Sequence, residues 1–436
     1  MKIAWFRRNI SPEVGVYLAG YGLKDKSVMK LDDLFADGLF MDDGKSKVLI
    51  ISLDLLGVDE WFVKKIRKAI SEILDIPEHA VLISCTHTHS GPETRSLAAH
   101  PEQFDHPYIE KLEAILADAA RSLTTAEFRE CTVSFYSCQC DENRNRRYTA
   151  GDNHASFTPH RHEVIPGCTG FADKELGGLV FFDKESELPV YIIGNYAAHP
   201  LAGHSIGLGG LRISADYPGA FRNYVSTNTG AEAMFISGAA GDMVPREDEM
   251  GDDASRGMGI RLGKAAISAV LEARRNPKRY RLADEVKVGS CIRTFQVPLR
   301  KRFRNNPDRL PEPYLGQDDV TLEIQCVSVG DICFIGVPGE LCAELGQEIK
   351  WHSPFRRTYI AYNSTAYFSY IGPANFLVSG GYEGSSQRFS ARGGLELLRT
   401  AVDAMFDLRE SLYPSQADDP YPDDQFLPLV SILPNH

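Results

Sequence analysis

The stretch that decides the fold runs from Lys47 to Pro92. It begins with the apolar run KVLIISLD (47–54), continues with EWFVKKIRKAISEIL (60–74) and ends with VLISCTHTHSGP (81–92). The first run and residues 81–85 have the length and apolar composition of buried strands. Between them, apolar side chains recur at helical spacing and are expected to share one face: Trp61, Val63, Ile66, Ile70 and Ile73. Strand, helix and strand with short connections predict a βαβ unit with two parallel strands.

Further apolar runs also end in loops that carry polar residues or glycine. Residues 190–197 precede His199-Pro200, residues 234–236 precede Gly238 to Asp242, and residues 332–337 precede Pro338-Gly339-Glu340. Helical spacing is expected at about 108–123, 216–227, 255–273, 341–350 and 394–408. This mixture predicts an α/β or α+β fold in which sheets are covered by helices. We expect residues 1–412 to form a single domain, followed by a loosely ordered Pro- and Asp-rich tail at 413–436.

Composition excludes several classes of partner. The net charge of −12 leaves no basic surface for a nucleic acid. The opening residues 1–8 lack the apolar core of a secretory signal, and no apolar run is long enough to cross a bilayer, so we expect no stable membrane insertion. The nine cysteines show no repeated spacing. Free thiols and a cytoplasmic location are therefore expected, whereas the oligomeric state stays open.

His87 and His89 are the first candidates for chemistry. They follow the carboxyl end of a predicted strand, where α/β sheets usually place their active sites. In an extended chain, residues two apart project from the same face about 7 Å apart. That spacing suits one metal ligand and one neighbouring general acid or base.

Glu340 and His199 extend this candidate site. Glu340 directly follows a mostly apolar run and a Pro-Gly turn, and an ionised carboxylate there requires a cation or several donors. His199 follows another buried strand; a lone histidine at such a position is more often structural than a ligand. Two histidines and a glutamate form a common catalytic zinc set that leaves room for water.

Two other groups have both a plain and a functional interpretation. The tyrosines between Tyr359 and Tyr382 are by default strand core and surface. Arg144, Arg146 and Arg147 form a basic group that is usually solvated, although an arginine fork also suits a carboxylate or an oxyanion.

A competing motif lies at 203–207. Gly203-His204-Ser205-Ile206-Gly207 fits the G-x-S-x-G pattern of a serine nucleophile, which requires a strand immediately before the serine and a helix immediately after it. Here residues 199–202 separate the strand from the motif, and Gly209-Gly210 follows, which disfavours a helix. A serine hydrolase using Ser205 stays an alternative, as does a non-catalytic metal- or ligand-binding protein.

Taken in order, the motifs resemble the amino-terminal catalytic domain of the neutral/alkaline, non-lysosomal ceramidase family. The resemblance covers nearly the whole chain, and its most specific part is Thr86 to Pro92. The motifs are Ile10-Ser11-Pro12, Leu18 to Gly22, Ser52-Leu53-Asp54, Thr86 to Pro92, Asn145-Arg146-Arg147, Asn195 to Pro200, Ser214 to Gly219, Ala240-Gly241-Asp242, Pro338-Gly339-Glu340 and Tyr382-Glu383-Gly384. This likeness implies a ceramidase-like catalytic domain over 1–412, with mixed β-sheets covered by helices in a layered sandwich.

The resemblance also implies a mononuclear zinc site. Its ligands would be His87, His199, Glu340 and Tyr370, the last placed by its distance ahead of Tyr382-Glu383-Gly384. His89 would be the acid/base residue, and Arg146 and Tyr382 would orient the substrate carbonyl and stabilise its oxyanion. Zinc lowers the pKa of a bound water to about 7 and polarises a carbonyl, which suits hydrolysis of an amide or ester near neutral pH.

Two departures argue against ceramide as the substrate. The family has a serine two residues after the Gly-Asp pair, and Val244 stands at that position here. The chain also ends soon after Tyr382, so we expect no carboxyl-terminal immunoglobulin-like domain. We predict a short, soluble branch of the family: a zinc-dependent hydrolase of the C–N bond in another small-molecule or amphiphilic amide.

Overall fold

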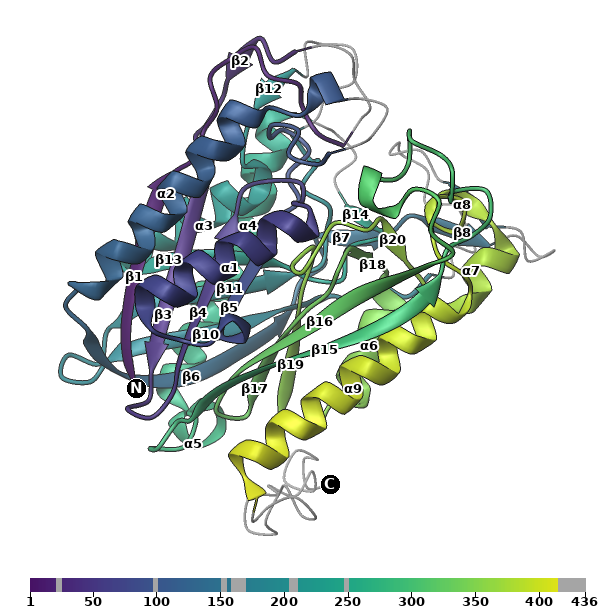
Figure 1. Cartoon of the computed structure of the whole chain (residues 1–436). Coiled ribbons are helices and arrows are strands. Elements are labelled where there is room, and N and C mark those ends of the chain that lie inside the picture. The colour runs from purple at the N-terminus through teal and green to yellow at the C-terminus, as the bar shows by residue number, and fades with distance from the viewer. Residues whose placement is uncertain are drawn as a thin grey trace, which may run out of the picture.

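In the computed structural model, β5 (Val81–Cys85), the strand that precedes the histidines, is an edge strand of an eight-stranded sheet (Figure 1). The structure describes residues 1–20, 26–96, 101–149, 155–157, 170–203, 211–246 and 251–414. Ser205 and residues 415–436, most of the predicted tail, lie outside these ranges. Within them the sheet has the order β13-β11-β10-β6-β1-β3-β4-β5. Its strands are β1 (Lys2–Asn9), β3 (Phe35–Asp42), β4 (Lys47–Leu53), β5 (Val81–Cys85), β6 (Arg129–Gln139), β10 (Glu175–Asp183), β11 (Pro189–Tyr196) and β13 (Glu232–Ser237).

The predicted βαβ unit is confirmed. β4 and β5 pair in parallel, with Leu49 opposite Val81, and α1 (Glu60–Leu74) connects them. The predicted apolar face was wrong at Trp61, which is 41% exposed. Phe62 takes the core-facing position in its place, and the Trp61 indole donates to Asp59 at 3.3 Å. Hydrophobicity alone cannot choose between adjacent aromatic residues, which lie about 100° apart around a helix.

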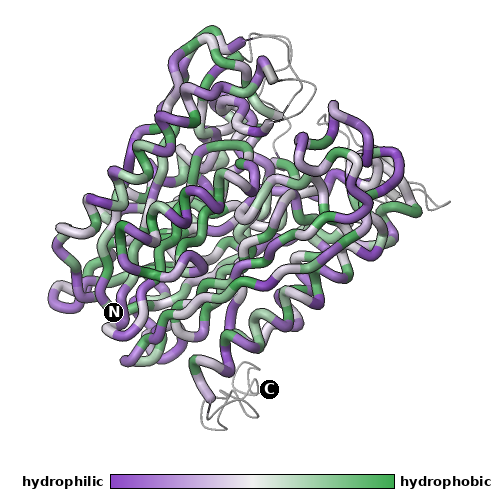
Figure 2. The backbone as a smooth tube through the Cα atoms, viewed as in Figure 1, coloured by the Kyte–Doolittle hydropathy of each residue, from purple (hydrophilic) through white to green (hydrophobic). Residues whose placement is uncertain are grey.

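A second sheet packs against the first (Figure 1). Its order is β15-β16-β17-β19, formed by β15 (Val288–Pro298), β16 (Asp319–Val329), β17 (Ile332–Gly336) and β19 (Arg357–Ala361). Side chains from β16 and β17, such as Val327 and Phe334, join the same hydrophobic core as Ile50 of β4 and Ile83 of β5. Figure 2 shows hydrophobic residues concentrated along these inner strands.

Helices cover the outer surfaces of both sheets. α3 (Asp216–Thr229) packs on β13, α4 (Asp252–Arg275) on β6 and β10, α2 (His106–Thr124) on β1 and α1, and α9 (Arg392–Leu412) on β15 and β16. α6 (Ala343–Trp351) starts two residues later than predicted, because Glu340–Leu341 forms the short strand β18. The predicted layered arrangement of sheets and helices is therefore confirmed. In the part of the chain that the structure describes, no helix combines the length and apolarity needed to cross a membrane.

Candidate active site

The candidate residues come from three segments that end at the same place. His87 and His89 follow β5, His199 follows β11, and Glu340 is the first residue of β18. Backbone hydrogen bonds hold these segments together: His89 N donates to Pro200 O at 3.2 Å, and Gly241 N donates to Leu341 O at 2.8 Å. Residues far apart in sequence are thus brought into one cluster by the sheet topology.

The functional atoms of this cluster face one another. Nε2 of His199 lies 3.2 Å from Oε2 of Glu340, and Nε2 of His87 lies 3.5 Å from the same oxygen. Nε2 of His89 lies 3.3 Å from Nε2 of His87. All four side chains are buried, and one ring nitrogen from each of His87, His89 and His199 lies within 4.8 Å of the other two, a spacing that could hold a metal ion.

The predicted extended geometry of the histidine pair is wrong. His87 has φ = 69°, so the chain turns there and the two imidazole centroids are 4.9 Å apart. Thr88 stabilises the turn because its hydroxyl donates to Ser214 O at 2.7 Å. Gly20 makes room for the second ring: a Cβ at Gly20 would lie 2.4 Å from Nδ1 of His89.

Backbone carbonyls orient two of the histidines. Nδ1 of His87 lies 2.8 Å from Leu56 O, and Nδ1 of His199 lies 3.0 Å from Met243 O. A carbonyl oxygen only accepts hydrogen bonds, so a protonated Nδ1 on His199 would donate to Met243 O and leave Nε2 free to bind a metal. Nδ1 of His87 also lies 2.8 Å from Nδ2 of Asn363, an amide donor, so Leu56 O alone does not set the tautomer of His87. Burial lowers the pKa of His199 to about 4, which favours the neutral, ligating form.

Glu340 is held by two tyrosines that the sequence did not single out. The Tyr362 hydroxyl donates to Oε2 at 3.2 Å, and the Tyr367 hydroxyl donates to Oε1. Burial opposes ionisation of Glu340, but the imidazoles of His87 and His199 outweigh it and hold its pKa well below the usual range. Nothing local distinguishes these two tyrosines from the others between 359 and 382.

Tyr370, Arg146 and Tyr382 lie together beside the cluster. β18 pairs in parallel with β20 (Tyr370–Ile371), which places Tyr370 opposite Glu340. Nη2 of Arg146 donates to the Tyr370 hydroxyl at 3.1 Å, and the Tyr370 and Tyr382 ring centroids are 5.3 Å apart. The structure thus brings all seven predicted site residues into one region.

The expectation that such an arginine group is solvated is wrong for Arg146 and Arg147. Both are buried, and Glu383 neutralises them: it accepts hydrogen bonds from Nε of Arg146 at 2.7 Å and from Nη1 of Arg147 at 2.9 Å. Arg144 is only half-buried, in β7 (Asn143–Asn145). Opposite Arg144 lies Val244 of β14 (Met243–Pro245), which is buried and offers no hydrogen-bonding group.

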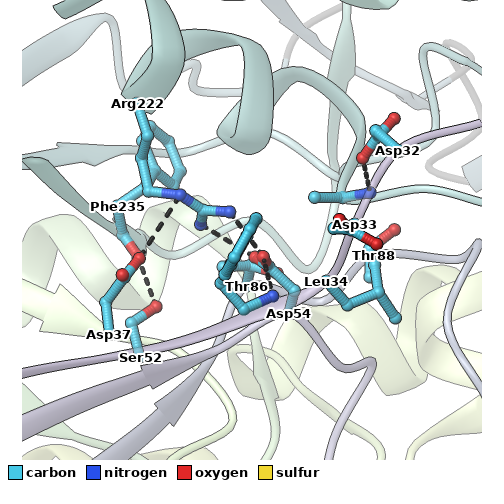
Figure 3. A network of polar contacts seen from close by, with 12 residues as sticks. Asp32, Asp33, Leu34, Asp37, Ser52, Asp54, Thr86, Thr88, Arg222 and Phe235 are labelled. Atoms are coloured by element: carbon cyan, nitrogen blue, oxygen red, sulfur yellow. Dashed lines mark hydrogen bonds and ion pairs between the residues drawn. The ribbon is translucent and has the colours of Figure 1, made fainter. Parts of the chain in front are cut away.

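An ionic network surrounds Asp54 and reaches Thr86, the residue before His87 (Figure 3). Nη1 of Arg222 lies 2.8 Å from Oδ1 of Asp54, and its Nε lies 3.3 Å from Oδ2 of Asp37. Asp54 also accepts from Phe35 N at 2.9 Å and from the hydroxyl of Thr86 at 3.3 Å. The network therefore fixes the residue that immediately precedes His87, and this explains the Ser52-Leu53-Asp54 motif as structural support.

Comparison with known proteins agrees with this architecture. No family model and no curated protein matches the chain. Among solved structures, neutral ceramidase from Pseudomonas aeruginosa superposes with a TM-score of 0.77 at 17% identity, covering 94% of this chain and 74% of that one. A ceramidase complexed with C2 gives a TM-score of 0.75 at 17% identity, covering 94% and 75%. Identity this low establishes a common fold and no more. The chain therefore has the fold of a neutral ceramidase, as its ordered motifs predicted.

Proposed function

We propose that this chain is a metal-dependent hydrolase that cleaves an amide (C–N) bond in a small or amphiphilic substrate, and that the metal is zinc. The observation that carries the proposal is that Nε2 of His199 and Nε2 of His87 lie 3.2 and 3.5 Å from Oε2 of Glu340, with Nε2 of His89 3.3 Å from Nε2 of His87. Nitrogen and carboxylate donors of this kind suit zinc. The ceramidase fold supports the same reaction class.

His87, His199 and Glu340 would hold the metal, and Tyr370 would complete the set from the neighbouring strand. The Nδ1 atoms of His87 and His199 both contact groups outside the cluster, so both Nε2 atoms face it and could serve as ligands. When bound, zinc supplies Lewis acidity, which activates water near neutral pH and polarises the substrate carbonyl.

His89 would transfer the proton. Its Nε2 is directed at the ligand cluster, 3.3 Å from Nε2 of His87. Burial, with the neighbouring His87 and His199, holds the pKa of His89 well below its usual range, so the ring is neutral near pH 7. Nε2 of His89 would take that proton from the attacking water and return it to the leaving amine.

Arg146 and Tyr382 would bind the substrate carbonyl. Glu383 and the Gly241 carbonyl, which accepts from Nη2 at 2.9 Å, hold the Arg146 guanidinium beside Tyr370. Tyr382 is 46% exposed and lies on the solvent side of this group, where a substrate would arrive. Each donor could stabilise the oxyanion by about 3 kcal/mol. Because Val244 replaces a serine of the ceramidases, we propose a substrate other than ceramide.

Metal analysis of the full chain and of His87→Ala tests the proposal. The wild-type chain should bind one transition metal and hydrolyse members of an acyl-amide panel, whereas His87→Ala should lose both properties. His352→Ala is a matched control, since this histidine is exposed and should not affect metal content.

Other outcomes would identify the alternatives. Activity that survives chelation, with labelling of Ser205 by a fluorophosphonate, would replace this proposal with a serine hydrolase. Bound metal without turnover on amides and esters would indicate a non-catalytic relative.

A further inference from the structure

Arg388 is a buried cation that has no anionic partner among the described residues. It is 7% exposed, and its guanidinium lies over the Phe368 ring, 5.7 Å from the centroid. Every other buried arginine that the structure describes pairs with a carboxylate: Arg67 with Glu323, Arg146 and Arg147 with Glu383, Arg222 with Asp54, and Arg409 with Asp331. Because burying an unpaired charge is unfavourable, this exception indicates an anion that the chain itself does not supply.

Arg388 lies close to the candidate active site. Its segment runs beside residues 367–370, since the Ser369 hydroxyl donates to Ser386 O at 3.0 Å and Phe389 stacks on Phe368 at 6.1 Å. Tyr367, the residue before Phe368, donates its hydroxyl to Glu340. A single tyrosine side chain thus connects the surroundings of Arg388 to the proposed metal ligand.

A second arginine lies against the same tyrosine. The guanidinium of Arg95 is 4.6 Å from the centroid of the Tyr367 ring, and Glu93 neutralises it through an Nε–Oε1 contact of 2.7 Å. The nearby Asp59 carboxylate is engaged by Ser96 N at 2.8 Å. Burial lowers the pKa of Arg388 to about 10. Arg95 adds to this lowering, whereas Tyr367 and the more distant Asp59 carboxylate oppose it. Among the described residues, Arg388 therefore forms no ion pair with a carboxylate.

We propose that Arg388 binds an anionic group of the substrate, so that the chain acts on amides that also carry a carboxylate or a phosphate. A guanidinium binds either group through two parallel hydrogen bonds. The anion would pair with Arg388 on one side of Tyr367, while the scissile carbonyl lies at the histidines on the other. This inference rests on the proposed function and assigns its substrate class.

Thermal unfolding of the full chain provides a test that needs no turnover. Without ligand, Arg388→Met should melt at the wild-type temperature or above, because an unpaired buried charge is removed. Arg67→Met, the matched control, should melt at a lower temperature because Glu323 loses its partner. N-acetylglycine or O-phosphoethanolamine should raise the melting temperature of the wild type more than that of Arg388→Met, and N-acetylethanolamine should raise neither. If Arg388→Met without ligand lowers the melting temperature as much as Arg67→Met does, the inference is overturned.

Kinetics with matched substrates then separate the two kinds of anion. N-acylglycine, N-acyl-O-phosphoethanolamine and N-acylethanolamine share one acyl chain and differ in charge. Arg388→Met should lower the kcat/KM ratio of the preferred anionic amide to the neutral one by about 10- to 100-fold. Turnover by the wild type without preference for either anion would refute the inference and leave the proposed function intact. Stabilisation by an anion that requires Arg388, without hydrolysis of any amide, would refute the proposed function instead.

Discussion

Replacing Arg222 by methionine removes the cation that neutralises Asp54 behind the histidine turn. Asp54 is fully buried, and among the described residues Arg222 is the cation that pairs with it. Asp37 is also buried but retains Arg7, whose Nε lies 2.6 Å from Oδ1. The substitution therefore leaves one carboxylate, rather than two, without a cation.

The expected loss in the free energy of unfolding follows from one buried carboxylate losing its cation. For charges about 4 Å apart at an effective dielectric constant near 20, the Coulomb attraction is about 4 kcal/mol. Breaking a buried pair by removing one partner costs about 3–5 kcal/mol, because the remaining charge stays desolvated. The hydrogen bonds from Phe35 N and Thr86 to Asp54 are retained. We therefore expect Arg222→Met to lower the free energy of unfolding by about 3–5 kcal/mol.

Equilibrium urea unfolding of the metal-free full chain, followed by circular dichroism, measures this loss. Adding Asp54→Asn to Arg222→Met should restore about half of it, because the amide oxygen still accepts hydrogen bonds and carries no charge. Lys65→Met is the control: Lys65 is 59% exposed and pairs with Glu113 at 2.7 Å, a surface contact worth less than about 1 kcal/mol. A loss for Arg222→Met no larger than that for Lys65→Met would refute the reasoning.

Three further predictions concern the site and its surroundings. Burial raises the pKa of Asp216 from 3.8 to about 6. The folded protein therefore holds this proton more tightly than the unfolded chain does. The free energy of unfolding is highest below pH 3.8 and falls as the pH rises through 6. Asp216→Asn should therefore gain up to about 3 kcal/mol on the wild type between pH 4 and pH 8 in urea unfolding. Gly20→Ala should displace His89 and lower turnover about 100-fold while bound metal, measured by elemental analysis, is retained; loss of metal would make His89 a ligand. Tyr370→Phe should weaken metal binding about tenfold in a competition titration, whereas Tyr382→Phe should lower turnover and leave metal affinity unchanged.

Local patterns predicted those parts of the molecule that depend on local physics. Residues 47–54 and 81–85 are apolar on both faces because helices or the second sheet cover both sides, so their parallel pairing through α1 could be predicted. The positions of His87 and Glu340 just beyond strand ends followed from the same runs.

Features that depend on contacts between distant segments could not be predicted. The left-handed turn at His87 is held by Ser214, and the burial of Arg146 depends on Glu383. Tyr362 and Tyr367 become partners of Glu340 only after residues 359–371 fold back beside β17 and β18. No pattern within one segment encodes such pairings, because each requires the register between elements that are far apart in the chain.

The wide separation of the site residues along the chain would also affect when the protein can acquire the metal proposed for it. At a synthesis rate of about 5–20 residues per second, the roughly 250 residues between His87 and Glu340 take about 13–50 seconds to translate. Throughout that interval the histidines of the nascent chain lack the carboxylate that completes their cluster. Loading of the proposed metal is therefore expected only after Glu340 has been synthesised, and cells starved of zinc during expression should accumulate chains that zinc can still activate after lysis.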